Sequence, residues 1–219
     1  MIMIYSLYEP AAAISSSEQA TTILDLLMKG GIIMIPIILL SLVTFYIFIE
    51  RMAYLKRTAA IDRGFLHNVV SELQSGNRNN AVTRVRSTEA ALGRILESGI
   101  DKLGKPQGEV ERNLETATNL EITKMEKNTG YLGIIAGVAP MLGFIGTISG
   151  VIKIFYNISL ADNISIGIIA GGLYQKMICS GAGLIVGVLA YAAYHYIQMR
   201  IDRYTIRLQE SLIQFLKVV

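Results

Sequence analysis

Charged residues are scarce in this chain. They make up 17% of its 219 residues, whereas 52% of the residues are hydrophobic. Soluble domains carry about a quarter of charged residues. The shortage of charge therefore indicates a membrane protein.

Residues that carry chemistry are few as well. A single cysteine, Cys179, cannot form a disulfide within the chain. The two histidines, His67 and His195, lie far apart and do not give the spacing of a zinc site. The net charge of +3 is too small to indicate nucleic-acid binding. The sequence also shows no nucleophile–base pair and no phosphate-binding loop, so we expect neither an enzyme nor a metal or cofactor.

Long apolar runs are what the sequence does have. Three of them, at 30–50, 131–156 and 164–198, reach the roughly 20 residues that a helix needs to cross a bilayer. The sequence therefore predicts an all-α integral membrane protein, with three transmembrane helices and long cytoplasmic helical extensions.

The cations predict how these helices are oriented. Seventeen of the twenty Lys and Arg residues lie in 51–130 or after residue 199, and such residues favour the cytoplasmic side. We therefore expect an outward-facing N-terminal segment and a cytoplasmic C-terminus. The expected organisation, in chain order, is N-terminal segment 1–29, transmembrane helix 30–50, cytoplasmic helical domain 51–130, transmembrane helix 131–156, short outer loop 157–163, transmembrane helix 164–198 and cytoplasmic helical tail 199–219.

The cytoplasmic segments show helical periodicity. Apolar residues recur at helical spacing in 61–73 and 91–100, and breakers stand at 75–80 and 104–108. No breaker separates the polar helix 109–128 from the second span, so one continuous helix is expected there. The third span should also continue inward, with an apolar stripe of Leu208, Leu212 and Leu216.

Tyrosines give the depth of the second and third spans. Tyr131 and Tyr196 should mark the inner edges, because tyrosine prefers the membrane interface. About 20 residues outward from each lie Gly150 and Lys176. Lys176 is then an interfacial residue whose stem extends along apolar surface to water. The alternative, a buried functional lysine, stays open.

Two hydroxyls fall at the same depth on this scale. Thr147 and Ser180 each lie sixteen residues from the tyrosine of their own span. Each belongs to a row of mostly small residues, namely Ala136, Pro140, Gly143, Thr147 and Gly150 in the second span and Gly172, Lys176, Ser180, Gly183 and Gly187 in the third. Such rows pack helices, and their hydroxyls then bond carbonyls. The alternative is that the two hydroxyls serve an ion path.

The same stretches resemble a known family. Leu142, Gly143, Gly146, Thr147 and Gly150 form the pattern Leu-Gly-x-x-Gly-Thr-x-x-Gly, and the third span contributes Met177, Ile178, Ser180, Gly183 and Leu184. Together they resemble the MotA/TolQ/ExbB proton channel family. Length and span count are similar to the ExbB/TolQ branch rather than to the four-span flagellar stator.

The resemblance implies a motor subunit of the bacterial inner membrane, with its N-terminus in the periplasm. Five copies would form a ring around an ExbD- or TolR-like partner, a single-span protein carrying an intramembrane Asp, and a TonB-like protein would receive the motion. Proton flow would energise outer-membrane transport or envelope processes. The implied site has pore-lining residues Thr147, Ser180, Gln175 and Lys176 and helix-packing residues Ala136, Pro140, Gly143, Gly146, Gly150, Gly183 and Gly187.

The chain departs from the family pattern at three positions. Ser180 replaces the usual threonine and keeps the hydroxyl. Gln175 stands where many relatives carry a glutamate, which puts a role of that acid in doubt here. Leu189 replaces a usual proline, so a straighter third helix is expected.

No carboxylate lies within the second or third span. Neither 131–156 nor 164–196 contains Asp or Glu, and hydroxyls ionise too weakly to carry a proton by titration, although they can bond water or a carboxylate. Either the chain conducts nothing, or a partner brings the carboxylate; we favour the second hypothesis. The alternative function is a structural membrane scaffold that oligomerises through the glycine-rich faces without ion conduction.

Overall fold

A computed structural model of the chain describes residues 31–60, 64–160 and 166–218, apart from the side chains of Ile168 and Gln175. These residues form helices and connecting turns, without a strand among them. The helices are α2 (Met34–Thr58), α3 (Phe65–Gln74), α4 (Arg78–Arg86), α5 (Ala91–Ile100), α6 (Gln107–Glu126), α7 (Thr129–Ser159) and α8 (Ile166–Leu216).

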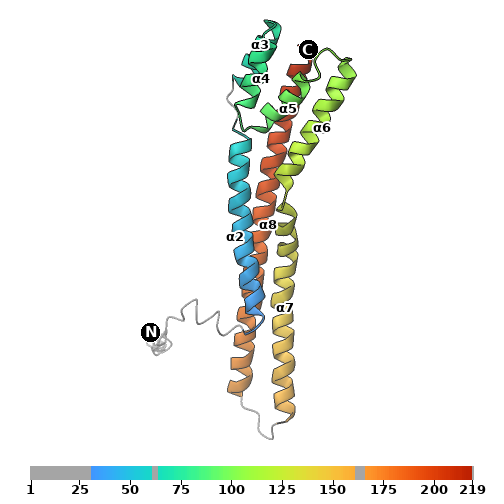
Figure 1. Cartoon of the computed structure of the whole chain (residues 1–219). Coiled ribbons are helices and arrows are strands. Elements are labelled where there is room, and N and C mark those ends of the chain that lie inside the picture. The colour runs from blue at the N-terminus through green and yellow to red at the C-terminus, as the bar shows by residue number, and fades with distance from the viewer. Residues whose placement is uncertain (1–30, 61–63, 161–165, 219) are drawn as a thin grey trace, which may run out of the picture.

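Three of the helices, α2, α7 and α8, contain stretches that are long and apolar enough to cross a membrane. They pack against one another along one half of an elongated molecule (Figure 1). The predicted fold class, all-α with three spanning helices, is confirmed.

Helix α8 runs the whole length of the molecule (Figure 1). Its 51 residues continue without a break from the membrane half into the opposite end, as predicted. There the stripe residues Leu208 and Leu212 are buried and Leu216 packs at the edge of the same core. The shorter helices α3–α6 and the last turns of α8 form what we call the helical bundle.

The core of the helical bundle agrees with the periodicity of the sequence. Ala91, Ile95, Leu96 and Ile100, the predicted apolar face of 91–100, are all fully buried. The first breaker is shorter than expected, because α4 begins at Arg78 inside the 75–80 stretch. Of the apolar residues in 61–73, Ile61 lies outside the described residues.

The expectation of one continuous helix from residue 109 into the second span is wrong. Helix α6 ends at Glu126, and Asn128 has a left-handed φ of +66°, a conformation that asparagine tolerates better than most residues. A helix end leaves its last carbonyls without partners. The buried Arg51 of α2 donates to one of them, the Lys124 carbonyl, at 3.1 Å. This contact stabilises the helix end at the break. The local spacing of residues in the sequence does not predict the contact.

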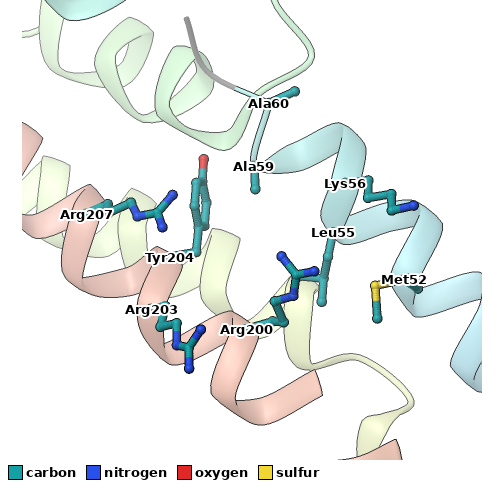
Figure 2. A pocket seen from close by; sticks show the side chains of 9 residues that line it. All are labelled: Met52, Leu55, Lys56, Ala59, Ala60, Arg200, Arg203, Tyr204 and Arg207. Atoms are coloured by element: carbon teal, nitrogen blue, oxygen red, sulfur yellow. The ribbon is translucent and has the colours of Figure 1, made fainter. Parts of the chain in front are cut away.

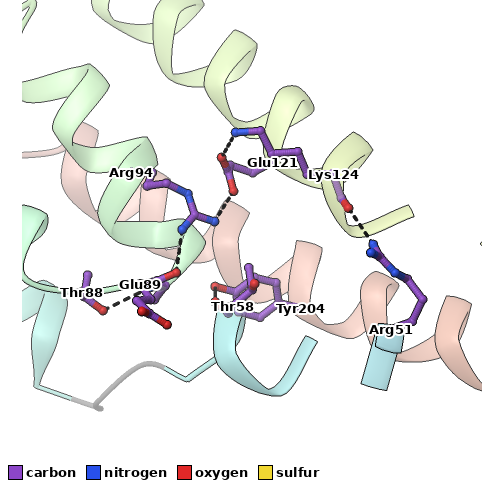
Figure 3. A network of polar contacts seen from close by, with 9 residues as sticks. Arg51, Thr58, Thr88, Glu89, Arg94, Glu121, Lys124 and Tyr204 are labelled. Atoms are coloured by element: carbon purple, nitrogen blue, oxygen red, sulfur yellow. Dashed lines mark hydrogen bonds and ion pairs between the residues drawn. The ribbon is translucent and has the colours of Figure 1, made fainter. Parts of the chain in front are cut away.

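A polar network joins four helices where the bundle meets the membrane half (Figure 3). Glu121 on α6 is buried, and its carboxylate accepts hydrogen bonds from Arg94 at 2.5 Å and Lys124 at 2.8 Å. The buried Tyr204 of α8 donates to the Thr58 carbonyl of α2 at 2.9 Å, and burial raises the pKa of Tyr204 to about 12. The network therefore fixes α2, α5, α6 and α8 relative to one another.

Replacing Glu121 by Gln should destabilise the bundle in a pH-dependent way. Burial by itself raises the pKa of Glu121, but the hydrogen bonds from Arg94 and Lys124 outweigh it, so the pKa is lowered overall. The stabilisation is therefore present above the unfolded-state pKa and lost as the pH falls through the folded-state value. We expect a loss of about 1–3 kcal/mol at pH 7, measured by thermal unfolding in detergent. The difference should shrink toward pH 4, and the exposed Glu115→Gln should change little at either pH; an unchanged deficit in acid would contradict this assignment.

Candidate functional site

The candidate site lies along the seam between α7 and α8. The two helices touch through their backbones where Gly183 meets Ala139 and Gly143: a Cβ added at Gly183 would stand 2.5 Å from the Ala139 carbonyl oxygen and 3.0 Å from the Gly143 Cα. A side chain does not fit at this point. Small residues allow such an approach, which in a membrane supplies the van der Waals contact that holds helices together.

Glycines continue the seam in both directions. A Cβ at Gly146 would stand 2.8 Å from the Cys179 Sγ, and one at Gly187 would stand 2.5 Å from the Pro140 ring and 3.1 Å from the Ala136 carbonyl oxygen. The structure thus brings Ala136, Pro140, Gly143, Gly146, Gly183 and Gly187 together in contacts within one chain.

The seam also sets the level of the two hydroxyls. Gly143 packs on the Ser180 backbone, with 3.0 Å between its added Cβ and the Ser180 Cα, and Gly146 packs on Cys179. Thr147 and Ser180 directly follow Gly146 and Cys179, and successive helical residues differ by only about 1.5 Å along the axis. The structure therefore places Thr147 and Ser180 within one turn of each other along the hairpin.

Both hydroxyl residues are half-buried at the edge of the seam. Thr147 Oγ1 donates to the Phe144 carbonyl of its own helix at 2.7 Å. Within the described part of the chain, no hydrogen bond engages the Ser180 hydroxyl. Thr147 keeps its oxygen lone pairs available, and Ser180 keeps both its donor and its acceptors. Ser180 can therefore donate to a carboxylate or a water, and Thr147 can accept from a water or from a protonated carboxyl group.

Lys176 lies level with the N-terminal end of α2. Its aliphatic stem packs directly over Gly150, and its Nζ lies 3.8 Å from the position of an added Cβ at Gly31, three residues before α2 begins. Gly150, Lys176 and Gly31 thus share one level, and the α7–α8 hairpin extends past it (Figure 1). The side chain of Gln175, the fourth residue of the expected pore lining, lies outside the described residues.

Glycines of these helices fall into two classes. The seam glycines are covered by the opposite helix of the same chain, whereas a Cβ added at Gly130, Gly137, Gly171 or Gly181 would meet nothing within 4 Å. The helix-packing residues expected from the sequence include none of these four open glycines, but the sequence alone does not tell whether the expected residues pack within one chain or between copies.

The described residues offer no ligand set for a metal ion, since they contain no group of three or more His, Cys, Asp or Glu side chains that could hold one. The sequence has no Asp or Glu in 131–156 or 164–196, so Thr147 and Ser180 offer hydrogen bonds at this level of the seam but no carboxylate. Such an arrangement receives a proton-carrying group more readily than it supplies one.

A helical multi-pass membrane protein with this small-residue hairpin is the class that fold and site define. The sequence model of the MotA/TolQ/ExbB proton channel family matches residues 87–210, which is more than half of the chain. The chain belongs to this family, a family of channel proteins and not of enzymes.

Individual relatives agree with this assignment. An ExbB homolog of Methanothermobacter thermautotrophicus is 28% identical over 183 residues, which cover 83% of this chain and 64% of that protein. The biopolymer transport protein ExbB of Salmonella typhimurium is 21% identical over 194 residues, covering 84% and 79%. The Tol-Pal system protein TolQ of Haemophilus influenzae is 29% identical over 91 residues, covering 42% and 40%. The chain thus spans less than two thirds of the first and third of these relatives.

The two classes of glycine should respond differently to the same substitution. Gly183→Leu places a side chain against the Ala139 carbonyl and should force α7 and α8 apart, whereas Gly181→Leu, two residues earlier in α8, meets open space in the chain. We expect Gly183→Leu to cost about 1–3 kcal/mol or more, as overpacking does. Thermal unfolding of the detergent-solubilised chain measures both. Equal stability of the two variants would show that the seam is not a close backbone contact.

Proposed function

We propose that this protein is the channel-forming subunit of a motor driven by the proton-motive force in the bacterial inner membrane. Five copies form a ring around an ExbD- or TolR-like single-span partner, and the complex energises biopolymer transport or an envelope process, through a TonB-like protein in the first case. Family membership supports the proposal, as do the names of the relatives, which include a biopolymer transport protein and a Tol-Pal system protein.

The observation that carries the proposal is a pair of hydroxyls without an acid. Thr147 and Ser180 lie within one helical turn of each other along the α7–α8 hairpin, and neither of these spans contains a carboxylate. A proton relay needs a group whose pKa is within reach of ambient pH. The partner's intramembrane Asp supplies this group, and the two hydroxyls receive it when it arrives. The chain is then a pathway wall, and the titrating residue belongs to the partner.

Assembly into a ring is supported by the surfaces that the chain leaves open. Helix α7 exposes large apolar side chains such as Met141, Phe144 and Ile148, and Gly137 beside them has no neighbour within 4 Å. An uncovered glycine inside a helix costs roughly 0.5–1 kcal/mol relative to alanine. A neighbouring subunit that approaches closely at this face explains why the cost is tolerated.

The scaffold alternative has less support. It relies on oligomerisation through the glycine-rich faces, and the faces around Gly143 and Gly183 pack against each other inside one chain. Oligomer contacts must therefore use other surfaces. The scaffold hypothesis also gives the level hydroxyls no role beyond local hydrogen bonding.

The proposed orientation places the helical bundle in the cytoplasm and the end of α7 outside. In a Cys179→Ser background, a cysteine at the exposed Asn157 should react with a membrane-impermeant thiol reagent in intact spheroplasts. A cysteine at the exposed Asn79 should react only after permeabilisation. Asn79 lies in the cation-rich segment 51–130, and Lys and Arg residues favour the cytoplasmic side of a membrane. Labelling of Asn79→Cys in intact cells would reverse the orientation.

Removing the two hydroxyls should stop transport without unfolding the protein. Thr147→Val keeps the β-branched shape, and a neutral hydrogen bond contributes only about 1 kcal/mol to stability. A carboxylate in a poorly hydrated site would lose its partners, which is much more costly. We expect Thr147→Val and Ser180→Ala each to lower motor-dependent uptake or envelope integrity, and the double variant to be non-additive because both hydroxyls serve one group.

Lys176→Gln is the control at the outer edge of the same seam and should be milder, since its stem packs over Gly150 away from the hydroxyl level. Native mass spectrometry of each variant should show the same pentamer with the same partner. Full activity of an assembled Thr147→Val, Ser180→Ala complex would refute the proposed role of these hydroxyls.

A further inference from the structure

A continuous groove runs between α2 and α8 on the surface of the molecule. One part, with a volume of about 630 Å³, is lined mainly by apolar side chains, and the next part, of about 300 Å³, has four cations among its lining residues. The two parts share Met52, Lys56 and Arg200. The groove therefore changes from apolar to cationic along its length without a break.

The cationic part is formed by both helices. Arg200, Arg203 and Arg207 follow one another along α8, and Lys56 comes from α2 (Figure 2). Arg200 reaches across toward Leu55 of α2, and Arg207 lies beside Tyr204 (Figure 2). The lining contains no carboxylate, and none of these four cations forms a salt bridge with another described residue. Glu210, one turn beyond Arg207, lines the adjoining hollow, which shares Ala59, Tyr204 and Arg207 with the cationic part.

The apolar part extends from these cations toward the middle of the membrane half. It is lined by Phe45 and Phe48 of α2 and by Leu189, Ala192 and Ala193 of α8. Tyr196 stands where the two parts meet, and its hydroxyl accepts a hydrogen bond from Arg200 at 3.1 Å. Tyrosine followed by arginine is the pattern of a membrane–water interface. The apolar part thus lies at acyl-chain depth and the cations at headgroup depth.

We propose that this groove binds an anionic phospholipid of the cytoplasmic leaflet. The phosphate lies among Lys56, Arg200 and the neighbouring arginines, and an acyl chain occupies the apolar part beside Phe48 and Ala192. Arginine forms paired hydrogen bonds to phosphate oxygens, and basic pockets between transmembrane helices on the cytoplasmic side take anionic headgroups. The choice of the cytoplasmic leaflet rests on the orientation given under the proposed function. The proposal that the groove binds an anionic lipid does not depend on that orientation.

Charge complementarity favours an anionic phospholipid over a neutral lipid or a second copy of the chain as the occupant of the groove. Three arginines and a lysine meet at one end of the groove, and an apolar helix from a neighbouring subunit would leave them without counter-charge. A soluble anion such as free phosphate would use the cations and leave the apolar part empty. A lipid with a charged phosphate and apolar tails matches both parts.

The test uses the purified full-length chain in mild detergent. Native mass spectrometry measures how much dioleoyl phosphatidylglycerol, or dioleoyl phosphatidylcholine in a parallel titration, remains bound per chain. In Lys56→Gln, Arg200→Gln protein, binding of phosphatidylglycerol should weaken about 30-fold, because each cation near an anionic headgroup contributes about 1 kcal/mol. Arg200→Lys, which keeps the charge, should retain most of the binding.

The matched control removes two cations that lie outside the groove. Arg57 follows Lys56 in α2, and Lys127 lies just beyond the end of α6; both are exposed. The Arg57→Gln, Lys127→Gln protein carries the same net charge as the groove variant and should bind phosphatidylglycerol like the unchanged chain. Ala192→Phe fills the apolar part without changing charge and should also weaken binding, whereas the exposed Val188→Phe, on the same helix but outside the groove lining, should not.

Three results would overturn the proposal. The first is equal binding of phosphatidylglycerol and phosphatidylcholine, and the second is an equal loss of phosphatidylglycerol binding in the groove variant and the control variant. The third is unchanged phosphatidylglycerol binding together with an altered number of subunits in the groove variant. The last would identify the groove as a contact between copies. Circular dichroism of each variant excludes unfolding as the cause of a loss. The measurement needs neither partner nor proton flow, so its failure leaves the proposed motor function standing, and a failed motor assay leaves the lipid result standing.

Discussion

Backbone contact between α7 and α8 is the constraint on which the rest of the membrane half depends. Lipid tails are as apolar as leucine, so helices in a bilayer are held by close packing and not by the hydrophobic effect. At Gly183 the opposite helix stands where a Cβ would be. Once this point is fixed, the antiparallel hairpin has only one register. The levels of Thr147 with Ser180, and of Gly150 with Lys176, follow from it.

Using these glycines inside the chain has a consequence for assembly. A face that is already in contact with its own hairpin partner is not available to a neighbouring subunit. The remaining surface combines open glycines such as Gly137 with large exposed apolar residues such as Phe144. In the proposed ring, folding of one subunit and contact between subunits use different faces of α7. A substitution at Gly183 would then act on the first, and one at Gly137 on the second.

Much of this architecture could be predicted from the sequence, because it depends on local patterns. Length and hydropathy define the three spans, and helical periodicity identifies the buried face of α5 and the tail of α8. The rest depends on contacts between distant residues. The break before α7 is supported by Arg51, 73 residues from the carbonyl that it caps. The partners of Glu121 and the division of the glycines likewise exist only after the helices have packed.

The break before α7 makes the two helices of the hairpin mechanically unequal. Helix α8 passes from the membrane half to Leu216 without interruption, and Tyr204 ties it to the end of α2. Any displacement of α8 in the membrane half is therefore transmitted to the helical bundle through one continuous rod. Helix α7 follows the Lys127–Asn128 joint, where the helix is interrupted, and its Leu132 is buried in the same core as residues of the bundle. Because Arg51 holds the α6 side of that joint, the direction of α6 is set by α2, whereas the direction of α7 is set by its seam with α8.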